Sequence, residues 1–182
     1  MTHNDAQSVY EYYRFCPRCG SALRVEKEHG KQLLVCEKND FTFYQNPHSA
    51  TAAIVRNNEG KIMLVKRAFD PAKGMWDVPG GFMDWGEEAE QSIVREMKEE
   101  LDVKFTPSKL LFAITDWYPF RGLNISVVNL YFAGTMTETP KQDDDVAGIG
   151  WFGLDELPEN IAFGHIRQAF TALRQEQKGH AS

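Results

Sequence analysis

Three carboxylates within one short segment are spaced so that they could bind divalent metal ions. Glu96 and Glu100 are four residues apart, and Glu99 follows Glu96 by three. Residues 88–101 contain neither Gly nor Pro, which predicts a helix that would bring these side chains to one edge. Carboxylates at close quarters repel one another. Mg²⁺ or Mn²⁺ would relieve the repulsion because both prefer oxygen ligands and substrate phosphates, so the segment predicts a site for either ion and a phosphorylated ligand.

Neighbouring residues would hold such a metal site in shape. Arg95 lies where its guanidinium can bind the carboxylate of Glu87 in a bidentate manner, which would tie the preceding loop to the helix. Gly80 and Gly81 allow the backbone to pass close to the ions, so the carbonyl of Gly80 is a further candidate ligand. The alternative is an ordinary solvated helix face. Six residue types at fixed spacing arise by chance in only about one window in ten million, which argues against that alternative for the pattern as a whole.

The spacing of these residues resembles the signature box of the Nudix hydrolases. Between Gly81 and Val103, every defined position of that family's pattern is present except at Asp102, where the family has glycine. That glycine usually ends the helix in a left-handed conformation, which Asp tolerates at a modest cost, so we expect the departure to affect local stability more than chemistry. The similarity extends over about residues 47–175 and includes the flanking segments 64–67, 74–80 and 151–158.

The resemblance implies an α/β fold, a Nudix-type α/β/α sandwich with a mixed sheet, and a metal-dependent hydrolase. Such an enzyme would cleave the diphosphate linkage of a nucleoside diphosphate joined to another group, as in ADP-ribose or NADH. Glu96 and Glu100 would be the principal metal ligands, while Glu99 would bind a further ion or take a proton from the attacking water. The base can instead lie outside the box. Asp145 is then the best candidate, although the acidic loop 143–145 can equally be a solvated loop tip.

A second class of function is a Nudix-fold sensor that binds a nucleotide sugar or an NAD derivative and regulates transcription without cleaving its ligand. Proteins of this kind commonly have an eroded box and an attached DNA-binding module. In this chain the box glutamates are intact, and residues 15–46 carry a mixture of acidic and basic side chains. Both observations argue against the sensor and in favour of the hydrolase.

Aromatic and basic residues near the box are candidates for binding the substrate. The segment 115–121 sits where the NADH pyrophosphatases carry a further motif, but it shares only Pro-Phe with that motif. Its aromatic rings could stack on a nucleobase, and arginines could contact phosphate. The alternatives are packing at strand ends or in a dimer for the aromatic residues, a loop anchor for Trp85, and ordinary surface positions for the arginines. The candidates are Arg67, Trp85, Trp117, Tyr118, Phe120 and Arg121.

Cysteines near the start of the chain suggest a second metal site. The first two are three residues apart and followed by Gly, as in a zinc knuckle, and the third comes at the spacing of a zinc ribbon. Asn39, a poor zinc ligand, stands where a fourth cysteine is expected. Either Asp40 or a nearby histidine such as His48 completes the site, or the ribbon has lost its metal and survives as a packed hairpin. The candidate ligands for this Zn²⁺ are Cys16, Cys19 and Cys36.

The arrangement is similar to that of the NADH pyrophosphatases, which carry a zinc ribbon ahead of the catalytic domain. A disulfide between the first two cysteines is less expected in a reducing cytosol. The chain is accordingly expected to have four parts. They are a lead at 1–14 whose Tyr10, Tyr12 and Tyr13 dock on the body, a zinc-ribbon-like β module at 15–46, a Nudix domain at 47–175 and a tail at 176–182.

Hydrophobic patterns predict the elements that must position the candidate groups. Four apolar runs predict strands, at 49–56, 61–66, 109–115 and 124–134, with turns at 57–60 and 119–122. The helix of the box has an apolar stripe of Ala89, Ile93, Met97 and Leu101, and a terminal helix at 161–177 has one of Ile166, Phe170 and Leu173. Trp76 is expected in the core beneath the box. Strands interleaved with two helices predict an α/β sandwich.

Composition and charge limit the remaining possibilities. The 182 residues, 42% of them hydrophobic, can supply a sizeable core. No run approaches the roughly 18 apolar residues of a membrane span, and the polar start is unlike a signal peptide, so a cytoplasmic location is expected. A formal net charge of −6 argues against broad binding of nucleic acid. We therefore expect a small nucleotide-type molecule as partner, no membrane association, and a homodimer as a candidate assembly.

Overall fold

The computed structural model describes residues 12–142 and 144–179, so Tyr10 and Asp143 lie outside the described residues. The chain divides into two compact units. The smaller unit comprises the chain up to Pro47 together with Pro119–Ile125, and the larger comprises His48–Tyr118 and the chain from Ser126 onward.

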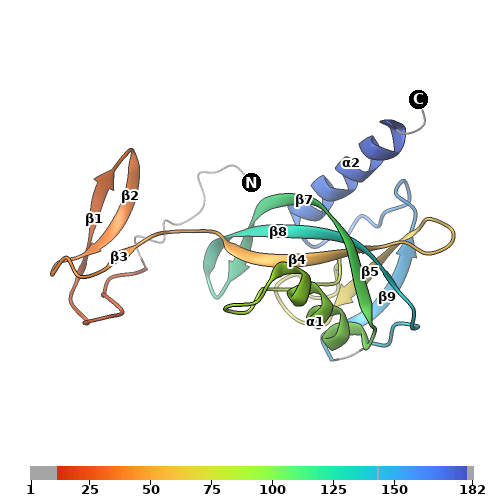
Figure 1. Ribbon diagram of the computed structural model, residues 1–182, viewed down its shortest axis with the longest axis horizontal. Coiled ribbons are helices and arrows are strands. Elements are labelled where there is room, and N and C mark those ends of the chain that lie inside the picture. The colour runs from red at the N-terminus through yellow and green to blue at the C-terminus, as the bar shows by residue number, and fades with distance from the viewer. Residues whose placement is uncertain (1–11, 143, 180–182) are drawn as a thin grey trace. The chain divides into compact units, whose positions relative to one another are not determined.

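The larger unit contains two three-stranded sheets and two helices (Figure 1). One sheet has the order β4-β8-β7, with β4 parallel to β8, and the other has the order β6-β5-β9, with β5 antiparallel to both neighbours. The tip of the β7–β8 hairpin belongs to the smaller unit. The elements are β4 (His48–Val55), β5 (Ile62–Arg67), β6 (Trp76–Asp77), α1 (Ala89–Leu101), β7 (Phe105–Phe120), β8 (Leu123–Met136), β9 (Val146–Phe152) and α2 (Gly164–Gly179).

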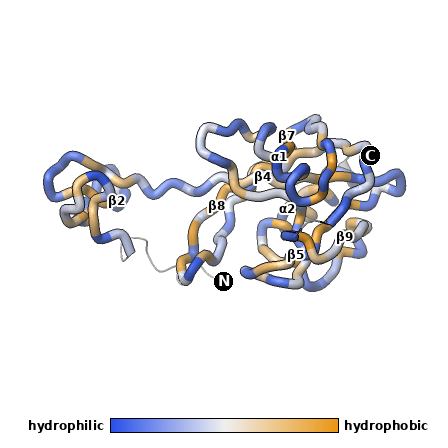
Figure 2. Tube along the Cα trace, turned by 90° about the horizontal axis from the view of Figure 1, so that it is seen from below, coloured by the Kyte–Doolittle hydropathy of each residue, from blue (hydrophilic) through white to orange (hydrophobic). Residues whose placement is uncertain are grey.

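Consecutive residues of the central strands face two separate hydrophobic cores. Ala52 and Ile54 of β4 pack in one core, while Ala53 and Val55 pack in the other, because side chains alternate between the faces of a sheet. The first core receives Ile166, Phe170 and Leu173 of α2, and the second receives Ile93, Met97 and Leu101 of α1. Strand β5 alternates in the same way, which explains its hydrophobic colour in Figure 2. The sheets therefore lie between α1 and α2, and the predicted α/β/α sandwich is confirmed.

The predicted turn at 57–60 is present, but the strands that it joins pair in different sheets. The Asn57 N–H donates to the Lys61 carbonyl at 3.0 Å, and a single bridge links Arg56 to Ile62. Beyond that bridge, β4 pairs with β8 and β5 pairs with β6 and β9. Turn residues specify a chain reversal, whereas pairing is decided by burial on both strand faces.

The box helix is bounded by caps at both ends. Glu88 forms a capping box with Gln91 at its start. At its end Asp102 is left-handed, with φ 53° and ψ 37°, as expected from its place in the pattern. Its carboxylate pairs with Lys98 and with Lys141, and these partners lower the pKa of Asp102 to about 2. The two lysines therefore help to hold a conformation that non-glycine residues seldom adopt.

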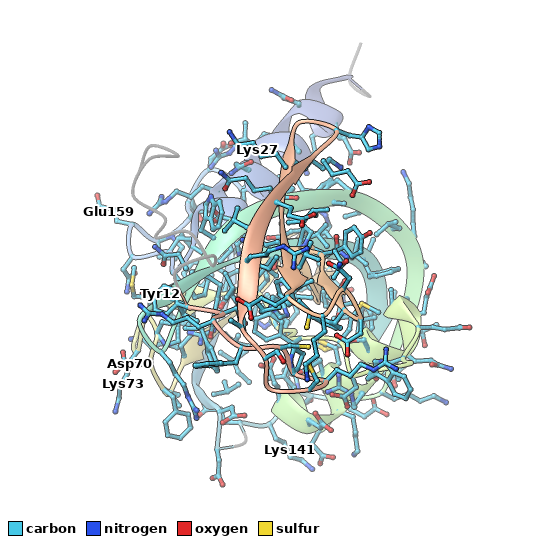
Figure 3. The ribbon with its side chains drawn as sticks, turned by 90° about the vertical axis from the view of Figure 1, so that its left-hand side faces the viewer. Tyr12, Lys27, Asp70, Lys73, Lys141 and Glu159 are labelled. Carbon is cyan, nitrogen blue, oxygen red and sulfur yellow. The ribbon has the colours of Figure 1, made fainter. Side chains whose placement is uncertain are left out.

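The smaller unit contains a three-stranded antiparallel sheet in the order β1-β2-β3. Leu34 and Cys36 of β2 are buried in it, together with Cys16. The β1–β2 hairpin turns through His29 and Gly30, both with positive φ, and presents exposed side chains such as Lys27 (Figure 3). The strands are β1 (Leu23–Glu28), β2 (Lys31–Cys36) and β3 (Thr42–Phe43).

Candidate active site

The loop that precedes α1 runs directly between β4 and the carboxylates of the helix. Gly80 has φ 138°, and a Cβ there would stand 2.1 Å from the Thr51 carbonyl oxygen. A Cβ on Gly81 would stand 2.7 Å from Oε1 of Glu96. Gly80 thus requires glycine, since a side chain there would collide with the backbone of β4, whereas a side chain at Gly81 would displace the carboxylate of Glu96. The loop is held by backbone hydrogen bonds, including one of 2.9 Å from the Thr51 N–H to the Gly81 carbonyl.

Two box glutamates, Glu96 and Glu100, line one cavity, and burial makes both costly to ionise. Burial raises the pKa of Glu96, and burial raises that of Glu100 to about 8, with Glu96, Asp77 and Asp145 adding repulsion. The backbone N–H of Gly80 donates to Oε2 of Glu100 at 3.0 Å, which fixes that side chain. Asp145 lines the same cavity. A cluster of oxygen donors that is costly to ionise fits a hard divalent cation, whose charge would offset the repulsion.

Arg95 connects the loop before α1 to the box carboxylates. Its Nε and Nη2 donate to the two carboxylate oxygens of Glu87, each at 2.9 Å, in the bidentate geometry expected from their spacing. Its Nη1 donates to Glu96 at 2.8 Å and to Glu99 at 3.0 Å, and its Nη2 also reaches the Phe82 carbonyl at 3.1 Å. The bonds from Arg95 lower the pKa of Glu87 to about 2. Glu87 is therefore ionised and engaged, and it orients Arg95.

Beside the carboxylates, the cavity has aromatic walls and a polar wall, and its volume is about 340 Å³. The ring of Tyr118 meets Phe82 edge-on at 5.4 Å and lies 5.3 Å from Phe163. Arg67 lies 5.1 Å above Phe163, donates to Oδ2 of Asp77 at 2.9 Å and reaches the Tyr118 hydroxyl at 3.4 Å. Flat apolar surfaces next to a few polar groups are typical of a small-molecule site.

The profile of the NUDIX domain family matches residues 46–172 of the chain. The protein belongs to the Nudix family. Nudix hydrolases generally depend on divalent metal ions and act on small nucleotide-type substrates. The predictions of a Nudix hydrolase and of its fold are thereby confirmed, and the helix that carries the acidic cluster is the helix of the Nudix box.

Several relatives and solved structures are similar over most of the chain. An ADP-ribose pyrophosphatase of Methanocaldococcus jannaschii is 33% identical over 144 residues, which is 76% of this chain and 81% of that protein. The NAD-capped RNA hydrolase NudC of Chromobacterium violaceum is 28% identical over 92% of this chain, although the chain spans only 62% of that protein. A NUDIX hydrolase from Nitrosomonas europaea superposes with a TM-score of 0.71 at 28% identity, covering 92% of this chain and 93% of that one.

The structure distributes the predicted site residues over several environments. The cavity is lined by Gly80, Glu96, Glu100, Asp145, Arg67, Trp117 and Tyr118. Glu87 and Arg95 brace it through the contacts above, and Glu99 is exposed and bound to Arg95. Trp85 is fully exposed, so it does not anchor the loop, and it is not among the lining residues. Phe120 and Arg121 belong to the smaller unit, where the Arg121 guanidinium lies 5.4 Å from the Phe120 ring.

Sequence reasoning missed the polar wall of the cavity. The polar residues of this wall, Asp77, Asp116, Asn129 and His165, come from β6, β7, β8 and the start of α2, and Phe163 directly precedes α2. Only Asp77 stands in a segment that resembles the family. The others are isolated polar or aromatic residues in apolar runs. The signal that the sequence offers for these lining residues is a polar residue within an apolar run that predicts a strand. The missed lining residues include Asp77, Asp116, Asn129, Phe163 and His165.

The cysteines of the smaller unit converge with one carboxylate. Ligand atoms of Cys16, Cys19, Cys36 and Asp40 all lie within 4.8 Å of one another. The cysteines are free thiols, and Sγ of Cys19 lies 3.5 Å from Sγ of Cys36, too far for a disulfide bond. Asn39 turns to Arg24, whose guanidinium donates to its side-chain oxygen at 2.5 Å. Among the alternatives left open by the sequence, Asp40 is the residue that the fold brings to the three thiols.

Proposed function

We propose that the protein hydrolyses the diphosphate linkage of a nucleoside diphosphate joined to a second group, with ADP-ribose as the first substrate to test. The observation that carries this proposal is that the box carboxylates and the aromatic walls line the same cavity. A diphosphate could lie against the acidic side while a base stacks against the rings. The name of the Methanocaldococcus jannaschii relative supports ADP-ribose, and the names of the NudC relatives make NAD-type dinucleotides the next candidates.

In this proposal, Glu96, Glu100 and the carbonyl of Gly80 hold Mg²⁺ or Mn²⁺, with Glu99 binding a further ion at the exposed rim. The ions would supply activation of the attacking water and neutralisation of the phosphoryl oxygens. Asp145 takes a proton from that water, which its place in the cavity wall beside Glu100 supports. Glu99 is less suited to this role because its carboxylate is exposed and held by Arg95.

Arg95 and Glu87 position the carboxylates that are proposed to bind metal ions, and they take no direct part in the reaction. Each oxygen of Glu87 accepts one bond from Arg95, which leaves Nη1 of Arg95 aimed at Glu96 and Glu99. Trp117 and Tyr118 are proposed to contact the base, and Arg67 to hold the aromatic wall through Tyr118 and Phe163. For Trp85, Phe120 and Arg121, substrate binding stays a prediction from the sequence.

A substrate screen tests the proposed function. The purified chain is incubated with Mg²⁺ or Mn²⁺ and with ADP-ribose, NADH, diadenosine polyphosphates or nucleoside triphosphates, and the products are separated by chromatography. We expect AMP and ribose 5-phosphate from ADP-ribose, with the two metals compared at equal concentration. Tight binding of a nucleotide without turnover of any candidate would instead support the sensor.

We also propose that Cys16, Cys19, Cys36 and Asp40 hold a structural Zn²⁺. A tetrahedral zinc with Zn–S bonds of about 2.3 Å places its sulfur ligands roughly 3.8 Å apart. The Cys19 and Cys36 sulfurs lie 3.5 Å apart, and Oδ1 of Asp40 lies 3.9 Å from Sγ of Cys19. Elemental analysis of protein purified without chelator should give about one zinc per chain, Asp40→Ala should lower that value, and Asn39→Ala should not. A value near zero for the natural sequence would reject the site.

The remaining predictions concern partners, location and domain boundaries. The exposed β1–β2 hairpin has mixed charge, since Lys27 (Figure 3) lies between Glu26 and Glu28 in the sequence, which supports weak binding of nucleic acid at most. Among the described residues, neither helix is long and apolar enough to cross a membrane. Homodimer formation, a cytoplasmic location and the domain boundaries at 14, 46 and 175 stay predictions. Light scattering on the purified chain would measure the assembly.

A further inference from the structure

The polar wall of the cavity contains three groups that the proposed hydrolysis does not use. Asp116 comes from β7, Asn129 from β8 and His165 from the first turn of α2. They line the cavity together with the rings of Tyr118 and Phe163. Their position beside stacking surfaces, on elements other than α1, suits recognition of a base more than binding of a diphosphate.

His165 presents a hydrogen-bond donor to this cavity. Its side chain is buried, with the residue only 9% exposed, and its Nδ1 lies 2.6 Å from the hydroxyl of Tyr131. Tyr131 is fully buried, and within residues 12–142 and 144–179 this contact is the one available to its hydroxyl proton. The hydroxyl therefore donates to Nδ1 of His165. Burial lowers the pKa of His165, so the ring is neutral, and its remaining proton resides on Nε2.

Nε2 of His165 has no hydrogen-bond partner in the part of the chain that the structure describes. Because no buried side-chain nitrogen or oxygen among those residues lacks a partner, Nε2 is open to the cavity that His165 lines, where a ligand acceptor can reach it. The reverse tautomer would leave the buried Tyr131 proton without an acceptor. The tyrosine thus makes His165 a donor at this position.

Asp116 and Asn129 present acceptors. Oδ2 of Asp116 accepts the His165 backbone N–H and Oδ1 accepts the Trp117 backbone N–H, each at 2.8 Å. These bonds orient the carboxylate and leave further lone pairs, and no lysine or arginine among the described residues forms a salt bridge with it. The side-chain nitrogen of Asn129 donates to the Ile114 and Val127 carbonyls at 3.3 and 3.4 Å, which leaves its oxygen as an acceptor.

We propose that Asp116, Asn129 and His165 are specificity-determining residues that select an adenine base over hypoxanthine. The two acceptors match the two protons of the exocyclic amino group, and the Nε2–H of His165 matches the adjacent ring nitrogen. Hypoxanthine inverts both groups: its carbonyl oxygen would meet Asp116 and its ring N–H would meet the His165 donor. Buried mismatches of this kind discriminate strongly between ligands. The inference rests on the proposed hydrolysis of a nucleoside diphosphate derivative.

The test compares ADP-ribose with its inosine analogue, which has the same diphosphate and sugars. We expect kcat/KM of the natural chain to favour ADP-ribose by at least about tenfold. Asp116→Asn replaces a pure acceptor with an amide that can also donate, so it should reduce that ratio at least about tenfold through loss on ADP-ribose. Asp155→Asn makes the same change at an exposed residue outside the cavity lining and should leave the ratio unchanged.

Asp116 also accepts a backbone bond at the start of α2, so Tm is measured for every variant. If Asp116→Asn unfolds, the ratio of kcat/KM for the two compounds on the natural chain decides the question. Equal kcat/KM for both compounds would overturn base selection while leaving the hydrolase intact. If neither compound is hydrolysed, the proposed function fails, and calorimetric binding of the same pair still decides the inference: equal affinities overturn it.

Discussion

The cavity has two acidic regions, and they differ in how their charge is compensated. On α1, burial raises the pKa of both Glu96 and Glu100, and the single arginine nearby is shared among several carboxylates. In the polar wall, Asp77 is paired with Arg67 at 2.9 Å, and Asp116 accepts two backbone N–H groups. The first region suits an external cation. In the second each carboxylate has a fixed partner, Arg67 for Asp77 and backbone N–H groups for Asp116, although burial also raises the pKa of Asp77. The partners of the carboxylates, more than their number, distinguish the two regions.

Replacing Glu100 with Gln is the strongest test of the first region. We expect turnover to fall by about a thousandfold or more, because the proposed metal ligand is lost, while the Tm of metal-free protein stays equal or rises once a buried carboxylate is removed. Steady-state kinetics and thermal melts measure the two effects. Glu90→Gln, an exposed position on the same helix, is the control. Full activity of the Glu100 variant would reject its assignment as a ligand.

Removing Arg67 tests whether this side chain compensates the charge of Asp77 in the polar wall. Arg67→Met should lower the free energy of unfolding by about 3 kcal/mol, because it leaves the buried carboxylate of Asp77 without its partner. Adding Asp77→Asn to that variant should restore part of the loss, since the unpaired charge is gone. Urea titrations of both single variants and the double variant measure the coupling. Additive losses would mean that the two side chains do not compensate each other.

The contacts of Arg95 can be weakened without removing its positive charge. Arg95→Lys keeps a cation but loses the bidentate grip on Glu87, so we expect kcat to fall by about ten- to a hundredfold, with a lower Tm. Arg56→Lys, an exposed position, is the control and should change neither quantity. If a lysine supports normal turnover, then charge alone, and not geometry, is what Arg95 contributes.

The smallest effect is expected at the end of the box helix. Asp102→Gly introduces the residue typical of the family, relieving the left-handed backbone while losing the contacts to Lys98 and Lys141, so the Tm at pH 7 should change little. The pKa of Asp102 is lowered to about 2, so its ionic contribution is present above its usual pKa of 3.8 and is lost as the pH falls through about 2.

Glycine should therefore gain stability relative to aspartate as the pH falls toward 2. Thermal melts of both chains at several pH values, with activity measured at pH 7, check this expectation. A large loss of activity in the glycine variant would mean that Asp102 acts on the chemistry and not only on the helix end.

The groups proposed to bind metal ions could be predicted from the sequence because they lie within one helix and the loop before it. The bidentate contact between Glu87 and Arg95, the apolar stripe and the left-handed Asp102 all follow from spacing along that segment. The polar wall could not be read in this way, because Asp116, Asn129 and His165 are far apart in the chain. In the smaller unit, spacing identified three cysteines, but only folding brought Asp40 to them.

The sequence by itself determined the family, the box helix and the residues suited to bind divalent ions, because helical periodicity converts spacing into geometry over a few turns. Only the tertiary structure decided which acidic groups are compensated. It paired Asp77 with Arg67, left Glu100 buried with a raised pKa, and set Tyr131 against His165. Burial and partners depend on how strands and helices pack, and these contacts join residues that no local pattern relates. The chemistry is thus encoded locally, and the proposed choice of base depends on the assembled fold.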